Sequence, residues 1–167
     1  MISGAFVKTI DTATNTLDSG GVGDETFPSG SAGIALTPDQ SQIWVAHSDP
    51  NFFVNRIQTD GSDGAQPPLT NLGSGSGPKA IAFTPDGSRA YVASVNGAGV
   101  FPIDTATGVA SAAIPLPDSA RSIAITPDGS RAFVPSAPAT TRTSTRSTWR
   151  RTRSSRPRSH SLRGPPT

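Results

Sequence analysis

The chain has 167 residues, no cysteine and a formal net charge of +2, which suits one ordinary domain and excludes disulfides and thiolate metal sites. The charge is divided between two regions: residues 1–136 carry six Lys or Arg and twelve Asp or Glu, whereas residues 137–167 carry eight Arg and no acid. The basic character therefore belongs to the final segment alone.

Residues 1–29 are predicted to be the end of a repeated β-sheet unit, comprising its outer strands. The phrase IDTATNT starts at Ile10 and recurs as IQTDG from Ile57 and IDTATG from Ile103. These starts lie 47 and 46 residues apart, and a fixed period of this length indicates one copied supersecondary unit. The first six residues lack the charged start and long apolar core of a signal peptide, and no stretch suits a membrane-spanning helix, so we expect neither.

Residues 30–77 are predicted to form one whole unit. A second phrase begins here as IALTPDQSQIWVA from Ile34, and it recurs as IAFTPDGSRAYVA from Ile81 and IAITPDGSRAFVP from Ile123. In each copy a proline presets φ at the second position of a tight turn between two short apolar strands. Gln40 replaces the turn glycine of the later copies.

Residues 78–118 are predicted to form the most regular unit, entered through the GSGSG stretch from Gly73. That stretch has the composition of a flexible connector and lacks the GK[ST] pattern of a phosphate loop. The unit shows no helical periodicity. Four strands are predicted, over residues 80–84, 90–94, 99–104 and 110–116, the first of them buried on both faces. Four antiparallel strands in about 40–45 residues are the size of one propeller blade.

Residues 119–136 repeat only the first half of a blade, its two leading strands. The units together make an arc and not a ring, which leaves strand edges and apolar blade faces without neighbours. We therefore predict an all-β fold, an incomplete β-propeller of four-stranded antiparallel blades. We also expect marginal stability or dependence on further chain.

The two phrases, in fixed order and spacing, resemble the YVTN-type β-propeller repeat of surface-antigen and lactonase-like propellers. The resemblance covers residues 1–136 and is fullest in TPDGSRAYVAS followed by FPIDTATG, over residues 78–117. It implies four-stranded blades and, for many members, binding of a protein or ligand. Members of the family are often found outside the cytoplasm, although this sequence leaves the compartment undetermined.

Candidate catalytic residues are better explained as structural. His47 follows the second strand of its blade without an accompanying carboxylate cluster, so we predict a loop histidine with a structural role, and His160 falls in the basic segment. Aspartates that recur in every copy are expected to bind backbone N–H groups of turns, namely Asp11, Asp39, Asp86, Asp104 and Asp128. The sequence therefore assigns no catalytic, cofactor-binding or metal-binding residue.

The remaining repeated side chains are expected to be surface or core residues. Arg89 and Arg131 share one blade position and could pair weakly with turn aspartates, whereas Arg56 and Arg121 lie elsewhere. One aromatic position in the second strand is predicted to pack between blades; it is occupied by Trp44, Tyr91 and Phe133.

Residues 137–167 are almost all Arg, Ser, Thr and Pro, and we expect them to be disordered. When the codons are read one base earlier, the genetic code permits VDVATDTVVAATVPLPAG over residues 147–164. That phrase matches IDTATGVASAAIPLP and starts 44 residues after Ile103. We therefore favour a frameshift near residues 137–141 that put this segment out of frame, over a solvated tail without a role and over an arm that binds nucleic acid.

The function predicted from the sequence is a non-catalytic repeat scaffold, not an enzyme, forming part of a larger propeller. An unidentified protein or small ligand would bind through the least repeat-like loops, residues 47–55 and 60–69, without a cofactor and without a membrane. The first alternative is a fragment of a lactonase-like propeller hydrolase, whose active residues would line a central channel. The second is salt-sensitive binding of nucleic acid through residues 137–167.

Overall fold

The computed structural model describes residues 7–22, 30–48, 52–62, 70–96 and 99–137. This part of the chain is all-β: it contains no helix, and hence none long and apolar enough to cross a membrane. Its strands are β1 Val7–Asp11, β2 Thr16–Val22, β3 Ser31–Leu36, β4 Gln42–His47, β5 Phe53–Gln58, β6 Thr70–Asn71, β7 Pro78–Phe83, β8 Arg89–Ser94, β9 Val100–Asp104, β10 Ser119–Ala120, β11 Ala124–Ile125, β12 Ala132–Phe133 and β13 Ser136–Ala137.

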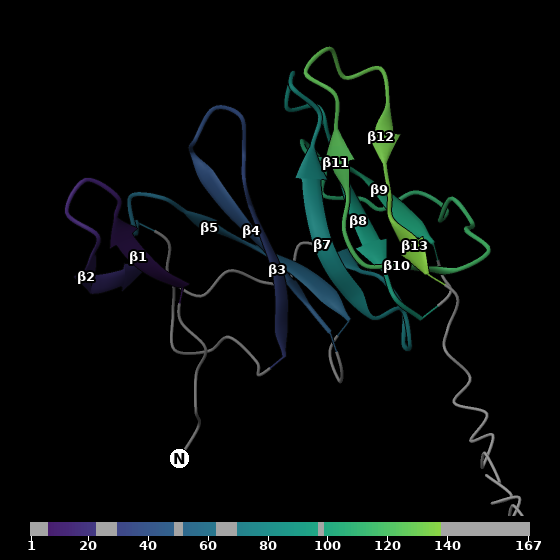
Figure 1. Cartoon of the computed structure of the whole chain (residues 1–167), viewed down its shortest axis with the longest axis horizontal. Helices are drawn as coiled ribbons and strands as arrows, with labels where there is room; N and C mark the ends of the chain where they lie inside the picture. Colours follow the sequence, from purple (N-terminus) through teal and green to yellow (C-terminus); the bar gives the residue numbers. More distant parts are fainter. Residues whose placement is uncertain (1–6, 23–29, 49–51, 63–69, 97–98, 138–167) are drawn as a thin grey trace, which may run out of the picture.

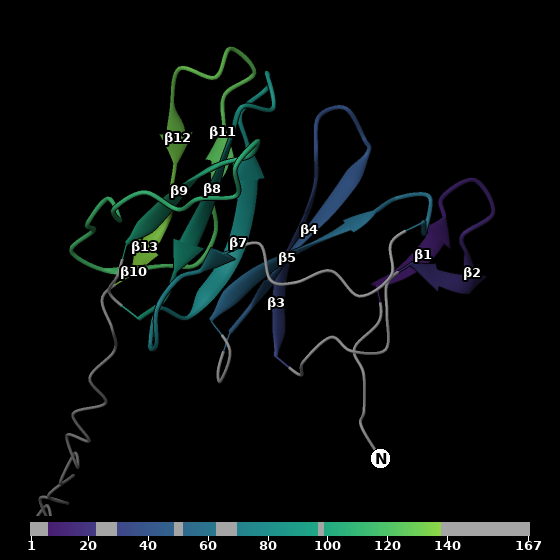
Figure 2. The same cartoon turned by 180° about the vertical axis from the view of Figure 1, so that it is seen from behind.

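The strands form antiparallel sheets that follow one another around an arc, as in an incomplete β-propeller (Figure 1). The order β3-β4-β5-β6 makes the first blade, and β7-β8-β9 makes the second. The β1–β2 pair precedes them. After them comes a hairpin, which we call the third hairpin, whose first strand consists of β10 and β11 and whose second strand consists of β12 and β13. The leading strands β3, β7 and β11 lie side by side along the arc, which Figure 2 shows from behind.

The three TPD turns lie at one common end of the blades (Figure 1). In each turn a backbone N–H donates to the carbonyl of the turn threonine, from Gln40, Gly87 and Gly129 at 2.8, 2.9 and 2.8 Å. All three donors have φ between 62° and 71°. Glycine adopts this conformation without steric cost, whereas Gln40 holds it with a side chain.

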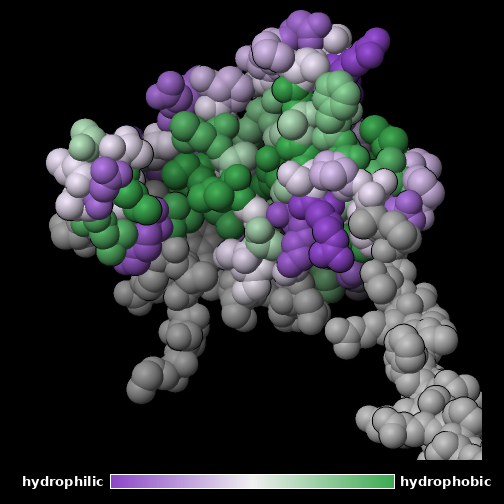
Figure 3. All heavy atoms as spheres, in the orientation of Figure 1, coloured by the Kyte–Doolittle hydropathy of each residue, from purple (hydrophilic) through white to green (hydrophobic). Residues whose placement is uncertain are grey.

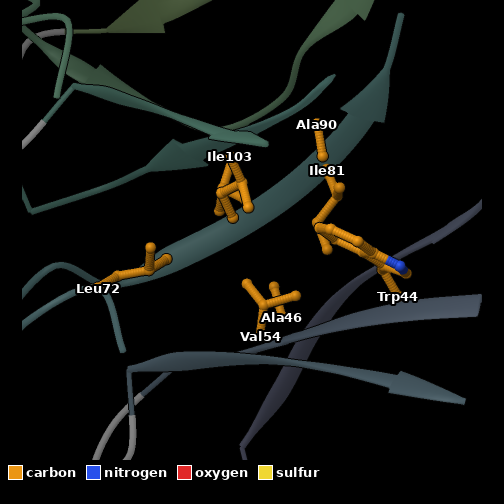
Figure 4. Packing of buried hydrophobic residues seen from close by; sticks show 8 residues of the cluster. Trp44, Ala46, Val54, Leu72, Ile81, Ala90 and Ile103 are labelled. Atoms are coloured by element: carbon orange, nitrogen blue, oxygen red, sulfur yellow. The ribbon is translucent and has the colours of Figure 1, made fainter. Parts of the chain in front are cut away.

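The core lies between the first and second blades, where β3–β6 packs face to face on β7–β9 (Figure 4). Trp44 is 1% exposed and meets the edge of Phe83, with ring centroids 5.1 Å apart. Its indole N–H donates to Gln42 Oε1 at 3.3 Å. The other buried members of this cluster are small or branched apolar residues, namely Ala46, Val54, Leu72, Ile81, Ala90, Val92 and Ile103. A large apolar side chain buried in this way contributes about 1.5–3 kcal/mol.

Close approach of the leading strands depends on Gly33. A Cβ at this position would lie 2.5 Å from the carbonyl oxygen of Lys79 and 2.9 Å from Ala80 Cα. No side chain fits at such distances, so glycine lets β3 lie directly against β7. The contact brings the two strands together at the inner side of the arc.

Two predicted strands differ from the structure for identifiable reasons. The run over residues 80–84 was predicted to be buried on both faces, but in strand β7 only Pro78 and Ile81 are buried. This strand is the first of its sheet, and one of its edges faces the open inner side of the arc. The fourth strand expected over residues 110–116 is reduced to isolated bridges, Ile103 with Ala110 and Val100 with Ile114. Pro115 has no N–H to donate, and pairing ends there.

The aromatic position packs between blades in two of its three copies, because Tyr91 also packs against a buried cluster, that of Ala93, Val100, Ala120 and Ile123. Tyr91 is half-buried, and Phe133 is exposed although its equivalent Trp44 is buried. The difference follows from position: among the described residues no blade packs on the far side of the third hairpin. The expectations for residues 138–167, including His160, lie outside the described residues.

Candidate functional site

The candidate site is the end of the blades opposite the TPD turns, where the leading strands begin; we call it the inner mouth. Each leading strand is paired there with the end of the second strand: Ser31 with His47, Pro78 with Ser94, and Ala120 with Ser136. Because β3, β7 and β11 are neighbours along the arc, these pairs gather at one end of the molecule. This is where a propeller's central channel opens.

His47 is the last residue of strand β4 and is fully buried, so the prediction of a loop histidine is wrong. Its ring lies against the ring of Phe53, with centroids 4.8 Å apart and planes inclined at 35°. Its Nδ1 lies 3.5 Å from the hydroxyl of Ser31. Burial keeps the imidazole from direct contact with a bound molecule in this conformation. It can, however, orient Ser31, which is exposed at the mouth.

Buried hydroxyl groups accompany His47 at this end. Ser94, which occupies the position of His47 in the second blade, and Ser76 are both buried, and within the described part of the chain neither hydroxyl has a hydrogen-bond partner. The hydroxyl of Ser119 donates to the carbonyl of Val95. Unpaired buried hydroxyls are costly, so they mark positions that a water molecule or a polar ligand can satisfy.

Two cations occupy equivalent positions on neighbouring leading strands. Aligning KAIAFTPDG with RSIAITPDG places Lys79 of β7 level with Arg121, which directly follows β10, and both side chains are exposed. The first blade has Ala32 at this position. Two positive charges at one mouth favour an anionic ligand. Arg121 was predicted to lie outside the repeated arginine position. The aligned leading strands are the sequence signal that identifies the pair.

The recurring aspartates lie at the opposite end and serve the turns. The hydroxyl of Thr37 donates to Asp39 Oδ1 at 2.6 Å, and Ser41 N–H donates to the same carboxylate at 3.1 Å. The equivalent threonine hydroxyl and serine N–H hold the pKa of Asp86 below its usual value and lower that of Asp128 to about 2. These carboxylates therefore stabilise the turns, and they do not contact a substrate at the mouth.

Third-strand aspartates act in the same way. Asp11 accepts from the backbone N–H groups of Ala13 and Thr14, and these bonds lower its pKa. The pKa of Asp104 is lowered mainly by the backbone N–H and hydroxyl of Thr107, and least by the charge of Arg89, its partner across strands β8 and β9.

The structure does not bring the two predicted binding loops together. Strand β5 runs between them, so residues 47–48 and 52–55 lie at the mouth and residues 60–62 at the turn end. Within them Phe53 to Asn55 are strand residues, and residues 49–51 and 63–69 lie outside the described part. The described ranges contain no group of three or more His, Cys, Asp or Glu that could hold a metal ion.

The sequence matches no protein-family model and no curated protein. Among solved structures, the fold is similar to hydrazine synthase of Kuenenia stuttgartiensis, with 22% identity and a TM-score of 0.64 over 80% of this chain and 36% of that one. It is similar to a gluconolactonase of Xanthomonas campestris, with 21% identity and a TM-score of 0.54 over 65% and 35% of the two chains. It is also similar to a protein described as a 6-phosphogluconolactonase from Bacteroides uniformis, with 15% identity and a TM-score of 0.57 over 78% and 43%.

These likenesses establish the fold as that of a partial β-propeller, and the chain spans only about a third to two-fifths of the length of the matched structures. They also correct two predictions, the non-catalytic binding scaffold and the conclusion that the chain is not an enzyme. The matched structures carry the names of enzymes, two of them lactonases, whereas the predicted scaffold was non-catalytic. The lack of a recognisable catalytic set does not exclude an enzyme, because an arc contributes only part of a central channel.

Proposed function

We propose that the chain is part of a lactonase-like propeller hydrolase whose substrate is an anionic sugar lactone. The likeness to lactonase propellers supports the reaction class, and the pair Lys79 and Arg121 at the inner mouth supports the negative charge of the substrate. Fold likeness alone does not carry a reaction, so the cation pair is the observation on which the substrate class depends.

We assign the described residues to binding the substrate and holding it in position. The ammonium group of Lys79 and the guanidinium of Arg121 would hold a phosphate or carboxylate of the substrate, the guanidinium by paired hydrogen bonds. Ser31, supported from behind by His47, would contact the sugar hydroxyls. The groups that activate water against the lactone carbonyl are assigned to blades that complete the channel.

Hydrolysis of 6-phosphogluconolactone and of neutral gluconolactone by the completed propeller that contains this chain tests this function. We expect Lys79→Ala and Arg121→Ala to raise KM for the phosphorylated lactone about tenfold or more, and to leave KM for the neutral one nearly unchanged. Arg131→Ala is the matched control, because Arg131 is equally exposed but lies next to the TPD turn. Absence of hydrolysis, or equal effects on both substrates, would contradict the proposal.

We also propose that the repeats are of the YVTN type and that a frameshift produced the Arg-rich segment. The recurring phrases from Ile34 and Ile10 support the first, and the reading permitted over residues 147–164 supports the second. Sequencing the gene and its flanks tests both. A shifted frame with V-D-x-A-T near codon 147 would support the frameshift, and stop codons in that frame would contradict it.

A further inference from the structure

Each leading strand carries one extra residue near the inner mouth, in a β-bulge. The pairing of β7 with β8 skips Lys79, and the pairing of β3 with β4 skips Ala32. In the third hairpin the leading strand again has one residue more than its partner, between the pairs made by Ala120 and Ala124. Arg121 lies in that stretch. The bulge therefore recurs at the same place of the repeat in each described leading strand.

A bulge changes the direction of its side chain. The extra residue interrupts the alternation of side chains between the two faces of a sheet, and so its own side chain is re-aimed. Lys79 is the one exposed residue of β7, and it follows Pro78, which is fully buried. Arg121 is exposed directly after the buried Ala120. Because the leading strands form the inner edge of the arc, a side chain turned out of the sheet here points toward the central channel of a propeller.

The bulges of the first two blades lie side by side. A Cβ on Gly33 would be 2.5 Å from the carbonyl oxygen of Lys79, so the backbone next to Ala32 touches the bulge of the second blade. Arg121 belongs to the next leading strand along the arc. Figure 3 shows hydrophilic side chains (purple) gathered over the lower part of β7 and beside β10. The channel wall therefore has one apolar position followed by two cationic positions.

Ala32 differs from Lys79 and Arg121 in both charge and size. Its methyl group attracts no anion and forms no hydrogen bond, whereas the two cationic side chains can bind a phosphate or carboxylate. The exposed Ser31 directly precedes it. A lysine or arginine at position 32 would fill the space in front of the first blade. Alanine leaves this space to the uncharged part of a ligand whose anionic group is held by the neighbouring cations.

We propose that Ala32 is a specificity-determining residue of the lactone site. Lys79 and Arg121 hold the anionic group, and the uncharged sugar ring lies against Ala32, next to Ser31. The ligand is thus a sugar that carries its negative charge at one end only. That this sugar is a lactone rests on the proposed function, whereas the placement of charge and ring follows from the bulges. A larger side chain at position 32 competes with the ring but not with the anionic group.

Binding of glucose 6-phosphate and of inorganic phosphate to the completed propeller that contains this chain tests the role of Ala32. Both ligands carry the anionic group, and only the first has a sugar ring. In calorimetric titrations we expect Ala32→Leu to weaken binding of glucose 6-phosphate about tenfold or more and to leave binding of inorganic phosphate nearly unchanged. Retained phosphate binding also shows that the variant is folded. Lys79→Ala should weaken binding of both ligands.

Two further variants serve as controls for position and charge. Ala106→Leu makes the same change at an exposed alanine of the turn end, beside the TPD turns, and should alter neither affinity. Ala32→Arg fills the space of the ring but adds a third cation. It should tighten binding of inorganic phosphate while it weakens binding of glucose 6-phosphate.

The outcomes separate this role from the hydrolase function. A propeller that hydrolyses neither lactone, but loses glucose 6-phosphate selectively in Ala32→Leu, contradicts the hydrolase and supports the role of Ala32. Equal weakening of both ligands by Ala32→Leu, or no weakening of either, overturns the role of Ala32 even where lactones are hydrolysed. Absence of binding of both ligands to the unchanged propeller overturns both proposals.

Discussion

The two faces of the first blade both carry apolar side chains, but these side chains are buried to different extents. The face toward the second blade buries Trp44, Ala46 and Val54. The opposite face meets only the β1–β2 pair: it buries Val45 and Ile57 but leaves Ile34 and Leu36 exposed beside a groove. The repeat places the same kinds of residue on both. Burial is therefore decided by the neighbouring blade, as expected when each unit stabilises only the units next to it.

The largest effect on the free energy of unfolding is predicted at the aromatic position of the second strand. Trp44→Ala should lower the free energy of unfolding by about 3–5 kcal/mol, because a buried indole leaves a cavity between two blades. Phe133→Ala should change it by less than about 0.5 kcal/mol in dilute monomer, where the ring is exposed. Urea unfolding of both variants measures the difference. Equal losses would show that a neighbouring blade does not decide the burial of this position.

A second prediction concerns the contact between leading strands. Gly33→Ala should cost about 1–3 kcal/mol, because its Cβ would collide with the backbone of β7. Ala80 holds the equivalent place in the second blade with its Cβ accommodated, so Ala80→Gly should cost only about 0.5–1 kcal/mol. Thermal and urea unfolding would compare them. A neutral Gly33→Ala would mean that β3 and β7 do not approach closely.

The smallest effects are expected at the TPD turns, where the aspartate accepts the same serine N–H bond in every copy. Hydrogen bonds lower the folded-state pKa of Asp128 from 3.8 to about 2. Its ionised form therefore contributes stability above pH 3.8, and this contribution is lost as pH falls toward about 2. Asp128→Asn should flatten the loss of stability over that window, as measured by urea midpoints at several pH values. An unchanged pH dependence would remove the role assigned to the carboxylate.

The fold was largely predictable, because the repeat phrases identify the leading strands and turns directly. Ile34, Ile81 and Ile123 mark equivalent places, and the structure sets them on or next to β3, β7 and β11. The prediction that Phe133 packs between blades was wrong, because periodicity describes a strand's own face, whereas Phe133 lies at an end of the arc where no described blade covers it. His47 was placed in a loop because its polar character and the following SDPN suggested the end of the strand one residue too early.

The site was less predictable than the fold. The cation pair at the inner mouth arises from two blades, and neither Lys79 nor Arg121 is distinctive in its own copy. Function depends on groups that converge in space, whereas the repeat signal records only what each unit shares. The enzyme names of similar structures corrected the functional interpretation where residue patterns did not.

Thiol labelling at three equivalent positions tests the central claim most directly. Ile34→Cys, Ile81→Cys and Ile123→Cys each add one thiol to a chain that has none. In dilute monomer the thiol at position 34 should react with maleimide nearly as fast as in the unfolded chain, and those at 81 and 123 should be strongly protected. Equal reactivity at all three positions, or protection at position 34 alone, would contradict the account.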